Sequence, residues 1–299
     1  MIDSTVAARN RLDLVSAVVC VPARALRVRQ WTKNLLLFGG LLFAAKLGDA
    51  TRWGEAWLAF AAYCAASSAA YLVNDVRDAQ HDRLHPTKRH RPVASGRLPA
   101  SWALGFAAAL AAVALAASAL LGLDSLSFLT VFLVVQLTYS IRLKQIAGLD
   151  VLAIAALFTI RSAAGAEAVE VRVSPWLLAC TALLALFLAL AKRRGELELS
   201  EAARRAVLAR YSVRALDRLL AAVALSTVGA YSAYTVGARD SLEMALTIPF
   251  VAAAIGRYLV LVHRHGLGEE PEEILLTDWP IRLAVAGWAL TAGLVLMLS

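Results

Sequence analysis

The chain has 299 residues, of which 60% are hydrophobic and 17% are charged, and its mean hydropathy is +0.65. Soluble globular domains are nearer half apolar and a quarter charged, so this composition excludes an ordinary soluble domain and indicates a membrane protein. The formal net charge is +8. In a membrane protein such an excess of cations first indicates which loops face the cytosol. We therefore expect no nucleic-acid partner.

The amino-terminal region, residues 1–29, contains five arginines and only a short apolar stretch, which Pro22 interrupts. It shows no evident cleavable signal peptide. We expect it to form a cytosolic or interfacial arm.

Nine segments are long and apolar enough to cross a bilayer, which takes roughly 20 apolar residues. They are 33–48, 54–74, 99–121, 125–141, 147–166, 175–191, 215–237, 241–262 and 281–298. Residues 103–121 and 177–191 carry no charge on any face, whereas a soluble helix keeps a polar face. We therefore predict an all-α fold, a polytopic bundle of about nine transmembrane helices that forms one domain over residues 1–299.

Two long connections between these segments are strongly basic. Residues 75–98 carry six lysines and arginines, and residues 192–214 carry seven. Because cytosolic loops of membrane proteins are rich in these residues, we expect both loops and the amino terminus in the cytosol. The 192–214 segment mixes its cations with apolar residues and predicts an interfacial helix.

Acidic residues follow the second apolar segment at helical spacing. Asn74, Asp78 and Asp82 recur every four residues, and Asp75 lies near the same arc, since each helical residue advances about 100°. Like charges this close repel each other unless a cation lies between them. Mg²⁺ takes oxygen ligands and keeps phosphate and water in its shell. We predict that Asn74, Asp78 and Asp82 bind Mg²⁺; the alternative is a solvated helix end with ordinary ion pairs.

A basic loop follows the acids. Two prolines in 85–92 favour an extended or turning backbone, on which Lys88, Arg89 and Arg91 can converge on an anion. Arginine forks match phosphate oxygens. Acids and cations together predict a membrane enzyme that acts on a Mg²⁺-diphosphate substrate.

The run Asn74-Asp75-x-x-Asp78-x-x-x-Asp82 resembles the first motif of the UbiA-type intramembrane prenyltransferase superfamily. Its continuation through His85-Pro86-x-Lys88-Arg89-x-Arg91-Pro92-x-Ala94-x-Gly96 resembles the decaprenyl-phosphate phosphoribosyltransferase branch. Further matches are Gln30-Trp31-x-Lys33-Asn34, Tyr139-Ser140-x-x-Leu143-Lys144 with Asp150, Ser174-Pro175-Trp176, Lys192-Arg193-x-x-Glu196, and Pro271-Glu272-Glu273 with Asp278. The resemblance implies a nine-helix bundle in the inner membrane, with a cytosol-facing cavity capped by the basic loops.

The activity that this resemblance implies is Mg²⁺-dependent transfer of 5-phosphoribosyl from phosphoribosyl diphosphate to a polyprenyl (decaprenyl-like) phosphate. Pyrophosphate is released, and the product leads toward lipid-linked arabinose donors for cell-wall synthesis. The expected catalytic residues are Asp75, Asp78, Asp82 and Asp150. The expected substrate-binding residues are Lys33, Asn74, Lys88, Arg89, Arg91, Tyr139, Lys144, Arg161, Lys192 and Arg193. The sequence leaves the oligomeric state open.

The second candidate site departs from the pattern of aromatic prenyltransferases, which pair two aspartates as DxxxD. Here only Asp150 is present, which favours the phosphoribosyl reaction. Asp150 and Arg161 lie about 16 Å apart along one helix, so each needs its own partner. Two alternatives remain: a prenyltransferase that moves an isoprenoid chain to an aromatic or other acceptor, and a non-catalytic lipid-binding or transport protein.

Overall fold

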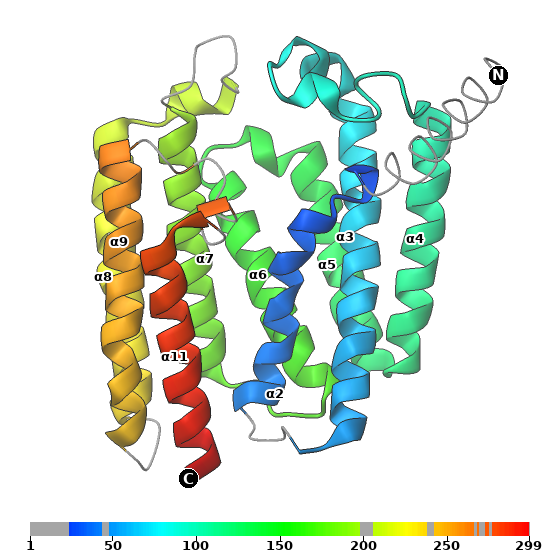
Figure 1. Ribbon diagram of the computed structural model, residues 1–299. Helices are drawn as coiled ribbons and strands as arrows, with labels where there is room; N and C mark the ends of the chain where they lie inside the picture. Colours follow the sequence, from blue (N-terminus) through cyan, green and yellow to red (C-terminus); the bar gives the residue numbers. More distant parts are fainter. Residues whose placement is uncertain are drawn as a thin grey trace, which may run out of the picture. The chain divides into compact units, whose positions relative to one another are not determined.

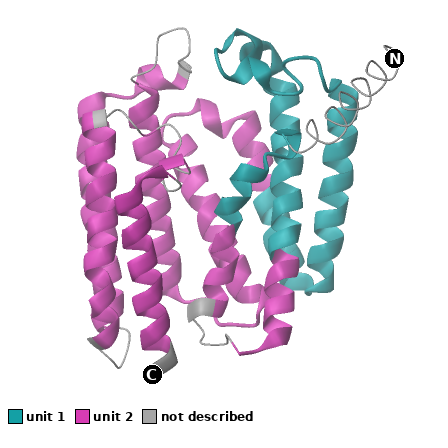
Figure 2. Cartoon of the chain, in the orientation of Figure 1, with its two compact units in different colours: residues 1–34, 60–133 teal, residues 35–59, 134–299 magenta. Residues whose placement is uncertain are grey.

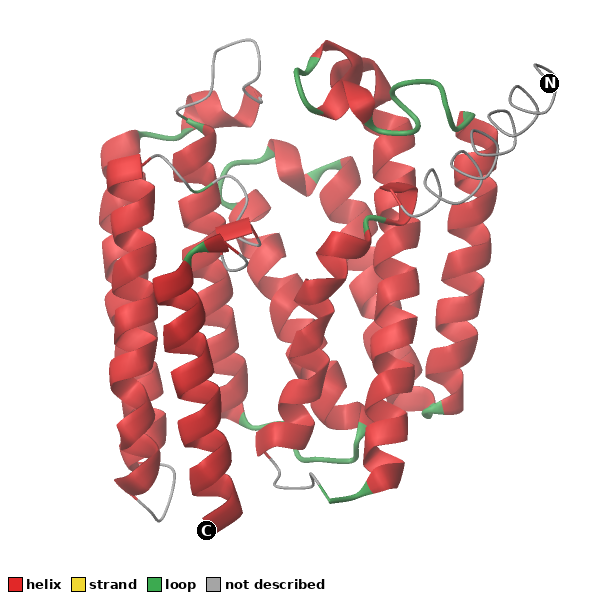
Figure 3. Ribbon diagram, viewed as in Figure 1, coloured by secondary structure: helices red, strands yellow, loops and turns green. Residues whose placement is uncertain are grey.

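The computed structural model describes residues 24–43, 48–197, 206–237, 242–265, 268, 273–274 and 277–298. These residues form helices joined by turns and contain no strand, which confirms the predicted all-α class (Figure 3). Eight helices of the described chain are long and apolar enough to cross a membrane. They are α3 (Ala50–Leu84), α4 (Ala100–Leu120), α5 (Leu123–Ile141), α6 (Leu149–Ala168), α7 (Pro175–Glu196), α8 (Val213–Gly237), α9 (Ile248–His265) and α11 (Trp279–Leu298) (Figure 1).

The first predicted span, 33–48, has a different structure over its described part. Val28–Phe38 forms the 3₁₀-helix η1, and Gly39–Phe43 forms the short helix α2. Gly165 of α6 approaches η1 so closely that a Cβ atom would overlap the Leu37 backbone, and Gly40 meets the Ala166 backbone in the same way. Small residues permit such backbone contact between membrane helices. The predicted count of nine spans stays a prediction, because residues 44–47 lie outside the described chain.

Two further boundaries differ from the sequence prediction. Helix α3 continues to Leu84, ten residues beyond the predicted end of its span, and so carries the whole acidic motif. The predicted interfacial helix 192–214 is wrong where its residues are described. Its first residues end α7, Ala206–Arg210 forms the short 3₁₀-helix η5, and its last residues begin α8. Residues 198–205 and most of the predicted arm, 1–23, lie outside the described chain.

The chain divides into two compact units (Figure 2). Unit 1 comprises residues 1–34 and 60–133, and unit 2 comprises 35–59 and 134–299. Helices α3 and α5 contribute residues to both units, and the prediction of a single domain stays a prediction. In unit 1, α3 packs against α4 mainly through small residues, among them Ala69, Ala103 and Ala107. This packing holds the segment of α3 that carries the acids.

Unit 2 has the larger buried core. Phe187 of α7, Leu216 and Leu220 of α8, and Tyr258 of α9 are buried in one cluster, and the Phe187 and Tyr258 rings stack edge to face at 5.4 Å. Leu290 and other large apolar side chains stay exposed on the helices. Such surfaces suit a lipid solvent, so the chain is an integral, multi-pass membrane protein.

Candidate functional site

The acidic motif lies on the last three turns of α3, in unit 1. Asp75 and Asp82 are buried and Asp78 is half-buried. Asp75 Oδ1 and Asp82 Oδ2 both approach one atom, Nη1 of Arg91, at 3.3 and 2.6 Å. The two carboxylates, seven residues apart on one face of the helix, therefore converge on a point that a cation occupies.

A second guanidinium reaches the motif from the region before η1. Arg27 forms an ion pair with Asp75, and its guanidinium carbon lies 4.8 Å from the centre of the Tyr71 ring. The Arg27 backbone has a φ of 52°, which residues with a side chain rarely adopt. Such strain persists only where surrounding contacts fix it, here the ion pair and the stacking on Tyr71.

The basic loop is largely exposed, but it folds back on α3 through some of its contacts. Arg83 Nε donates to the Ala94 carbonyl at 3.1 Å, and Arg97 Nη2 donates to the His90 carbonyl at 2.6 Å. Within the short 3₁₀-helix η2 (Lys88–His90), Lys88 is half-buried and Arg89 is exposed. Of the three cations that we expected to meet on one anion, Arg91 is turned toward the α3 carboxylates.

The motif Gln30-Trp31-x-Lys33-Asn34 connects η1 to α3 by hydrogen bonds within unit 1. Trp31 Nε1 donates to Ser68 Oγ at 3.1 Å, and Asn34 Nδ2 donates to Cys64 Sγ at 3.2 Å. Lys33, expected to bind substrate, donates to Gln30 Oε1. Trp31 and Asn34 thus hold the segment that presents Lys33.

Whether this motif suits Mg²⁺ depends on its donors and their arrangement. The donors are all oxygen atoms, which Mg²⁺ requires, and the carboxylates of Asp75 and Asp82 already meet at one cation. Within the described residues, no three His, Cys, Asp or Glu side chains gather around one point. The chemistry of the donors therefore suits Mg²⁺, but the described side chains do not form a preassembled metal site.

The second candidate site is a buried network in unit 2. Asp150 and Arg193 are both fully buried, and Asp150 Oδ2 lies 2.6 Å from Arg193 Nε. Arg193 also pairs with Glu196 and donates through Nη2 to the Tyr139 hydroxyl at 3.3 Å. One arginine thus joins two acids and a tyrosine that the sequence places on three helices.

Tyr211 closes the network at the base of α6. Its hydroxyl donates to Asp150 Oδ1 and accepts the backbone N–H of Gly148 at 2.8 Å. Gly148 has a φ of 85°, which glycine adopts without strain. Burial raises the pKa of Tyr211 to about 12, and its bond to the Asp150 carboxylate acts in the same direction. The hydroxyl therefore stays protonated and a donor at neutral pH.

The other residues expected in the second site have separate positions. Arg161 is buried, donates to the Leu157 carbonyl at 3.3 Å and lies over the Phe158 ring. Asp150 and Arg161 thus each have their own partner, as expected from their separation. Lys144 lies in the 3₁₀-helix η3 (Leu143–Gln145) and Lys192 near the end of α7, both half-buried.

Two residues of these clusters have no expected role in the sequence analysis. Arg27 lies 48 positions before Asp75, and Tyr211 lies 61 positions after Asp150. No spacing rule predicts contacts over such separations. The contact between Arg193 and Glu196 was predictable from the sequence, because a cation and an acid three residues apart face each other on a helix.

Comparison with known proteins agrees with the motif and the fold. The UbiA prenyltransferase family matches residues 35–272. A decaprenyl-phosphate phosphoribosyltransferase of Mycolicibacterium smegmatis is 35% identical over 96% of this chain and 94% of its own. One of Mycobacterium tuberculosis is 36% identical over 94% of each chain. The structure of a UbiA homolog from Archaeoglobus fulgidus bound to GPP and Mg²⁺ has a TM-score of 0.74, with 19% identity over 93% of this chain and 99% of that one.

Proposed function

The chain belongs to the UbiA prenyltransferase family, and on that premise we propose that it transfers 5-phosphoribosyl from phosphoribosyl diphosphate to a polyprenyl phosphate. The observation that carries the proposal is the similarity, over nearly the whole length of both chains, to the two mycobacterial phosphoribosyltransferases. In the reaction the C1–O bond to the diphosphate breaks, C1 bonds to a phosphate oxygen of the lipid, and pyrophosphate leaves.

The α3 motif is the proposed site of the donor diphosphate. Asn74, Asp78 and Asp82, with Asp75 beside them, would hold Mg²⁺. A bound Mg²⁺ would neutralise the charge that develops on the leaving pyrophosphate. Arg91 and Arg27 compensate the carboxylates in the ligand-free chain, and once released they are positioned to bind phosphate oxygens. Lys88 and Arg89 supply further cations from the neighbouring loop.

The acceptor phosphate is already an anion, so the reaction needs no strong general base. Lys33, Lys144 or Lys192 is the proposed contact of that phosphate. Asp150 was expected to stabilise positive charge on the ribose, with Tyr139, Arg161 and Arg193 around the donor. Because Asp150 is fully buried against Arg193, we propose instead that this pair has a positioning role: it fixes the ends of α6 and α7. We propose that this chemistry takes place on the cytosolic side of the inner membrane, and the basic loops support that orientation.

A transfer assay tests the proposal directly. The purified full-length protein receives Mg²⁺, polyprenyl phosphate and phosphoribosyl diphosphate labelled in the ribose. Label is expected in the lipid phase, and its transfer is expected to stop on chelation with EDTA and to resume on addition of Mg²⁺. Absence of transfer with several chain lengths of polyprenyl phosphate would reject the proposed donor and acceptor.

A second candidate is prenyl transfer, because the A. fulgidus homolog of the same fold was solved with GPP and Mg²⁺. A parallel reaction with geranyl diphosphate and an aromatic acceptor separates the two activities. Product formed only in the reaction with geranyl diphosphate would favour prenyl transfer. Asp150 without a second aspartate four residues away argues for the phosphoribosyl donor.

A further inference from the structure

A cavity lies in unit 2 at the end of the helices remote from the Asp150–Arg193 network. Its volume is about 260 Å³. It is lined by the end of α6, the connection to α7, the first turns of α7, the last turns of α8, and Gly40 of α2. From Trp176 to Arg193, α7 rises roughly 25 Å. The cavity therefore belongs to the opposite membrane interface from the buried network, and the proposed transfer reaction does not use it.

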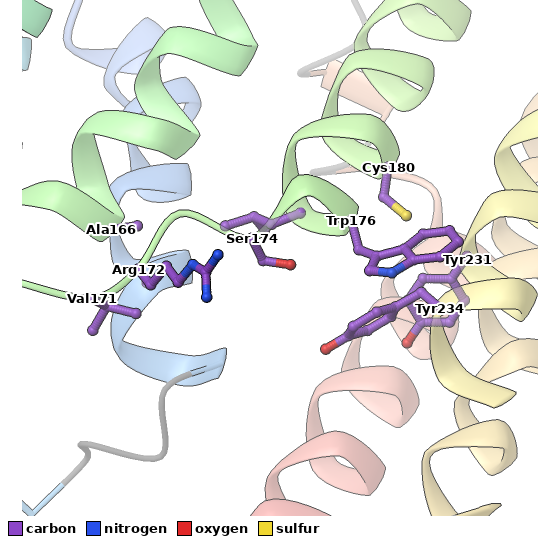
Figure 4. Close-up of a pocket in the computed structure, with 10 residues that line it drawn as sticks. Ala166, Val171, Arg172, Ser174, Trp176, Cys180, Tyr231 and Tyr234 are labelled. Atoms are coloured by element: carbon purple, nitrogen blue, oxygen red, sulfur yellow. The ribbon is translucent and has the colours of Figure 1, made fainter. Parts of the chain in front are cut away.

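Aromatic rings form one wall of this cavity. Trp176 lies 6.4 Å from Tyr234, and Tyr234 lies 6.2 Å from Tyr231, between ring centres. The Tyr231 hydroxyl accepts a hydrogen bond from Trp288 Nε1 at 2.7 Å and bonds Thr247 Oγ1 at 2.7 Å. These bonds fix the ring, so the wall is formed before any ligand enters. Figure 4 shows the three rings grouped on one side of Ser174.

A single cation faces this wall. Arg172 lines the cavity on the other side of Ser174, beside Val171 and Ala166 (Figure 4). Among the described residues, none forms an ion pair or hydrogen bond with its guanidinium. The nearby acid in sequence, Glu170, instead pairs with Arg52 at 2.6 Å. The positive charge of Arg172 is therefore uncompensated by the described chain and attracts an anion.

The hydroxyl of Ser174 adds a polar group beside the arginine. Ser174 occupies the N-cap position of α7, and its side chain makes no capping hydrogen bond. The hydroxyl and the N–H groups of the first turn after Pro175, which itself has no N–H, are thus available to an anionic oxygen near Arg172. Helix amino termini favour negative charge. The cavity combines one anion-binding corner with an apolar aromatic wall.

We propose that this cavity binds an anionic lipid. The headgroup phosphate would bind Arg172 and Ser174, and the adjoining apolar carbons would lie against Trp176, Tyr231 and Tyr234. A soluble anion would use the corner but not the wall, and an uncharged lipid would use the wall but not the arginine. Only an anionic amphiphile matches both. Because the cavity lies at a membrane interface, the bilayer itself supplies such a ligand.

Cys180 provides a reporter, because it lines the cavity and is half-buried. In the full-length chain with Cys20→Ser and Cys64→Ser, it is the single remaining cysteine of the three. The protein is placed in nanodiscs of dioleoylphosphatidylcholine, with or without dioleoylphosphatidylglycerol, and the rate of Cys180 alkylation by N-ethylmaleimide is measured. We expect the anionic lipid to slow alkylation about tenfold, as for a ligand held by one charge-assisted contact.

Variants at two described arginines of this membrane end identify the cause. Arg172→Gln should abolish the protection, and Arg172→Lys should retain most of it. Arg52→Gln removes a cation that is already paired with Glu55 and Glu170 and should leave the protection intact. Each variant is first checked for monodisperse elution.

Three results would overturn the assignment. One is equal alkylation rates in the two lipid compositions. Another is persistent protection in a folded Arg172→Gln variant. The third is equal protection by inorganic phosphate in phosphatidylcholine nanodiscs, which would identify a soluble anion as the ligand.

Discussion

The acids of α3 in unit 1 and the Asp150–Arg193 network in unit 2 use the same chemistry, carboxylates compensated by guanidinium groups, in different surroundings. The side chains of Asp75 and Asp82 are 3% and 7% exposed, but those of their partners Arg27 and Arg91 are 20% and 25% exposed. In unit 2 both Asp150 and Arg193 are 0% exposed. The α3 pairs border a space that solvent can reach, whereas the Asp150–Arg193 pair is sealed from solvent.

This difference separates exchangeable from permanent ion pairs. A partly exposed arginine can leave its carboxylate for water or phosphate at small cost, because exposed pairs contribute little. A fully buried arginine cannot leave without stranding a charge in a medium of low dielectric constant. We infer that the α3 carboxylates are available to a cation from solution, whereas Arg193 acts by holding three helices and two acids in place.

The largest expected effect is on stability, at Arg193. Arg193→Met leaves Asp150 and Glu196 buried without their cation and should cost roughly 3–5 kcal/mol in unfolding free energy. The measurement is the apparent melting temperature in detergent, followed by size-exclusion chromatography.

The matched control for this prediction is the next residue. Arg194 pairs with Asp217 at 3.0 Å, and the two side chains are 13% and 34% exposed, so Arg194→Gln leaves an acid that water can reach and should cost about 1 kcal/mol. Equal melting temperatures for the two variants would mean that the buried network is not the stabilising element.

The next effect is on turnover, at the acids of α3. Asp78→Asn or Asp82→Asn keeps the size of the side chain and removes a charge that would bind Mg²⁺. Each should reduce kcat at least about 100-fold, or ~2.7 kcal/mol of transition-state stabilisation. The melting temperature should change little, because Arg91, the partner of Asp82, is partly exposed.

The control is Asp124→Asn, since Asp124 is an exposed acid in the first turn of α5. Its turnover should match that of the parent protein. Strong Mg²⁺-dependent activity in either α3 variant would remove the residue from the proposed metal site.

A smaller effect is expected from the basic loop. Arg91→Ala should remove a charge-assisted contact worth roughly 1.5–3 kcal/mol, which is about a 10- to 150-fold loss in kcat/KM for the donor. The loss in kcat/KM for the lipid acceptor should be smaller. Lys88→Ala and Arg89→Ala test whether neighbouring cations share the role, and we expect at least one of them to behave like Arg91→Ala.

Steady-state kinetics against each substrate separately measures these effects, with Arg142→Ala as the control at an exposed arginine after α5. If donor kinetics stay unchanged in all three loop variants, the loop serves orientation in the membrane alone.

The smallest effect concerns Tyr211. Tyr211→Phe removes the hydrogen bond to Asp150 and should cost about 1 kcal/mol of stability at neutral pH. The folded protein raises the pKa of Tyr211 to about 12, above the value of about 10 for a free tyrosine. The protonated hydroxyl therefore stabilises the fold fully below pH ~10, and this contribution is lost as the pH rises toward 12.

Melting temperatures of the parent protein and Tyr211→Phe, measured from pH 8 to pH 12, check this prediction. The difference between them should shrink across the upper part of the range. A constant difference would show that the hydroxyl does not titrate as the buried network requires.

The sequence by itself determined the class of the protein and the location of its acids. Long apolar segments have few folded solutions in a bilayer, because every backbone polar group must be satisfied within the segment. Helical periodicity likewise places Asp75, Asp78 and Asp82 on one face, since it depends only on neighbours along the chain. Seven of the predicted spans therefore lie almost wholly within single helices of the structure: 54–74, 99–121, 125–141, 147–166, 175–191, 215–237 and 281–298.

Only the tertiary structure decided which charges meet. Arg27 reaches Asp75 across 48 residues, Tyr211 reaches Asp150 across 61, and the described part of the first apolar segment forms 3₁₀ and short α-helical turns against Gly165 of α6. Local periodicity contains no information on such contacts. They arise because buried charges must find partners in a medium of low dielectric constant, and because helices pack most closely where side chains are smallest.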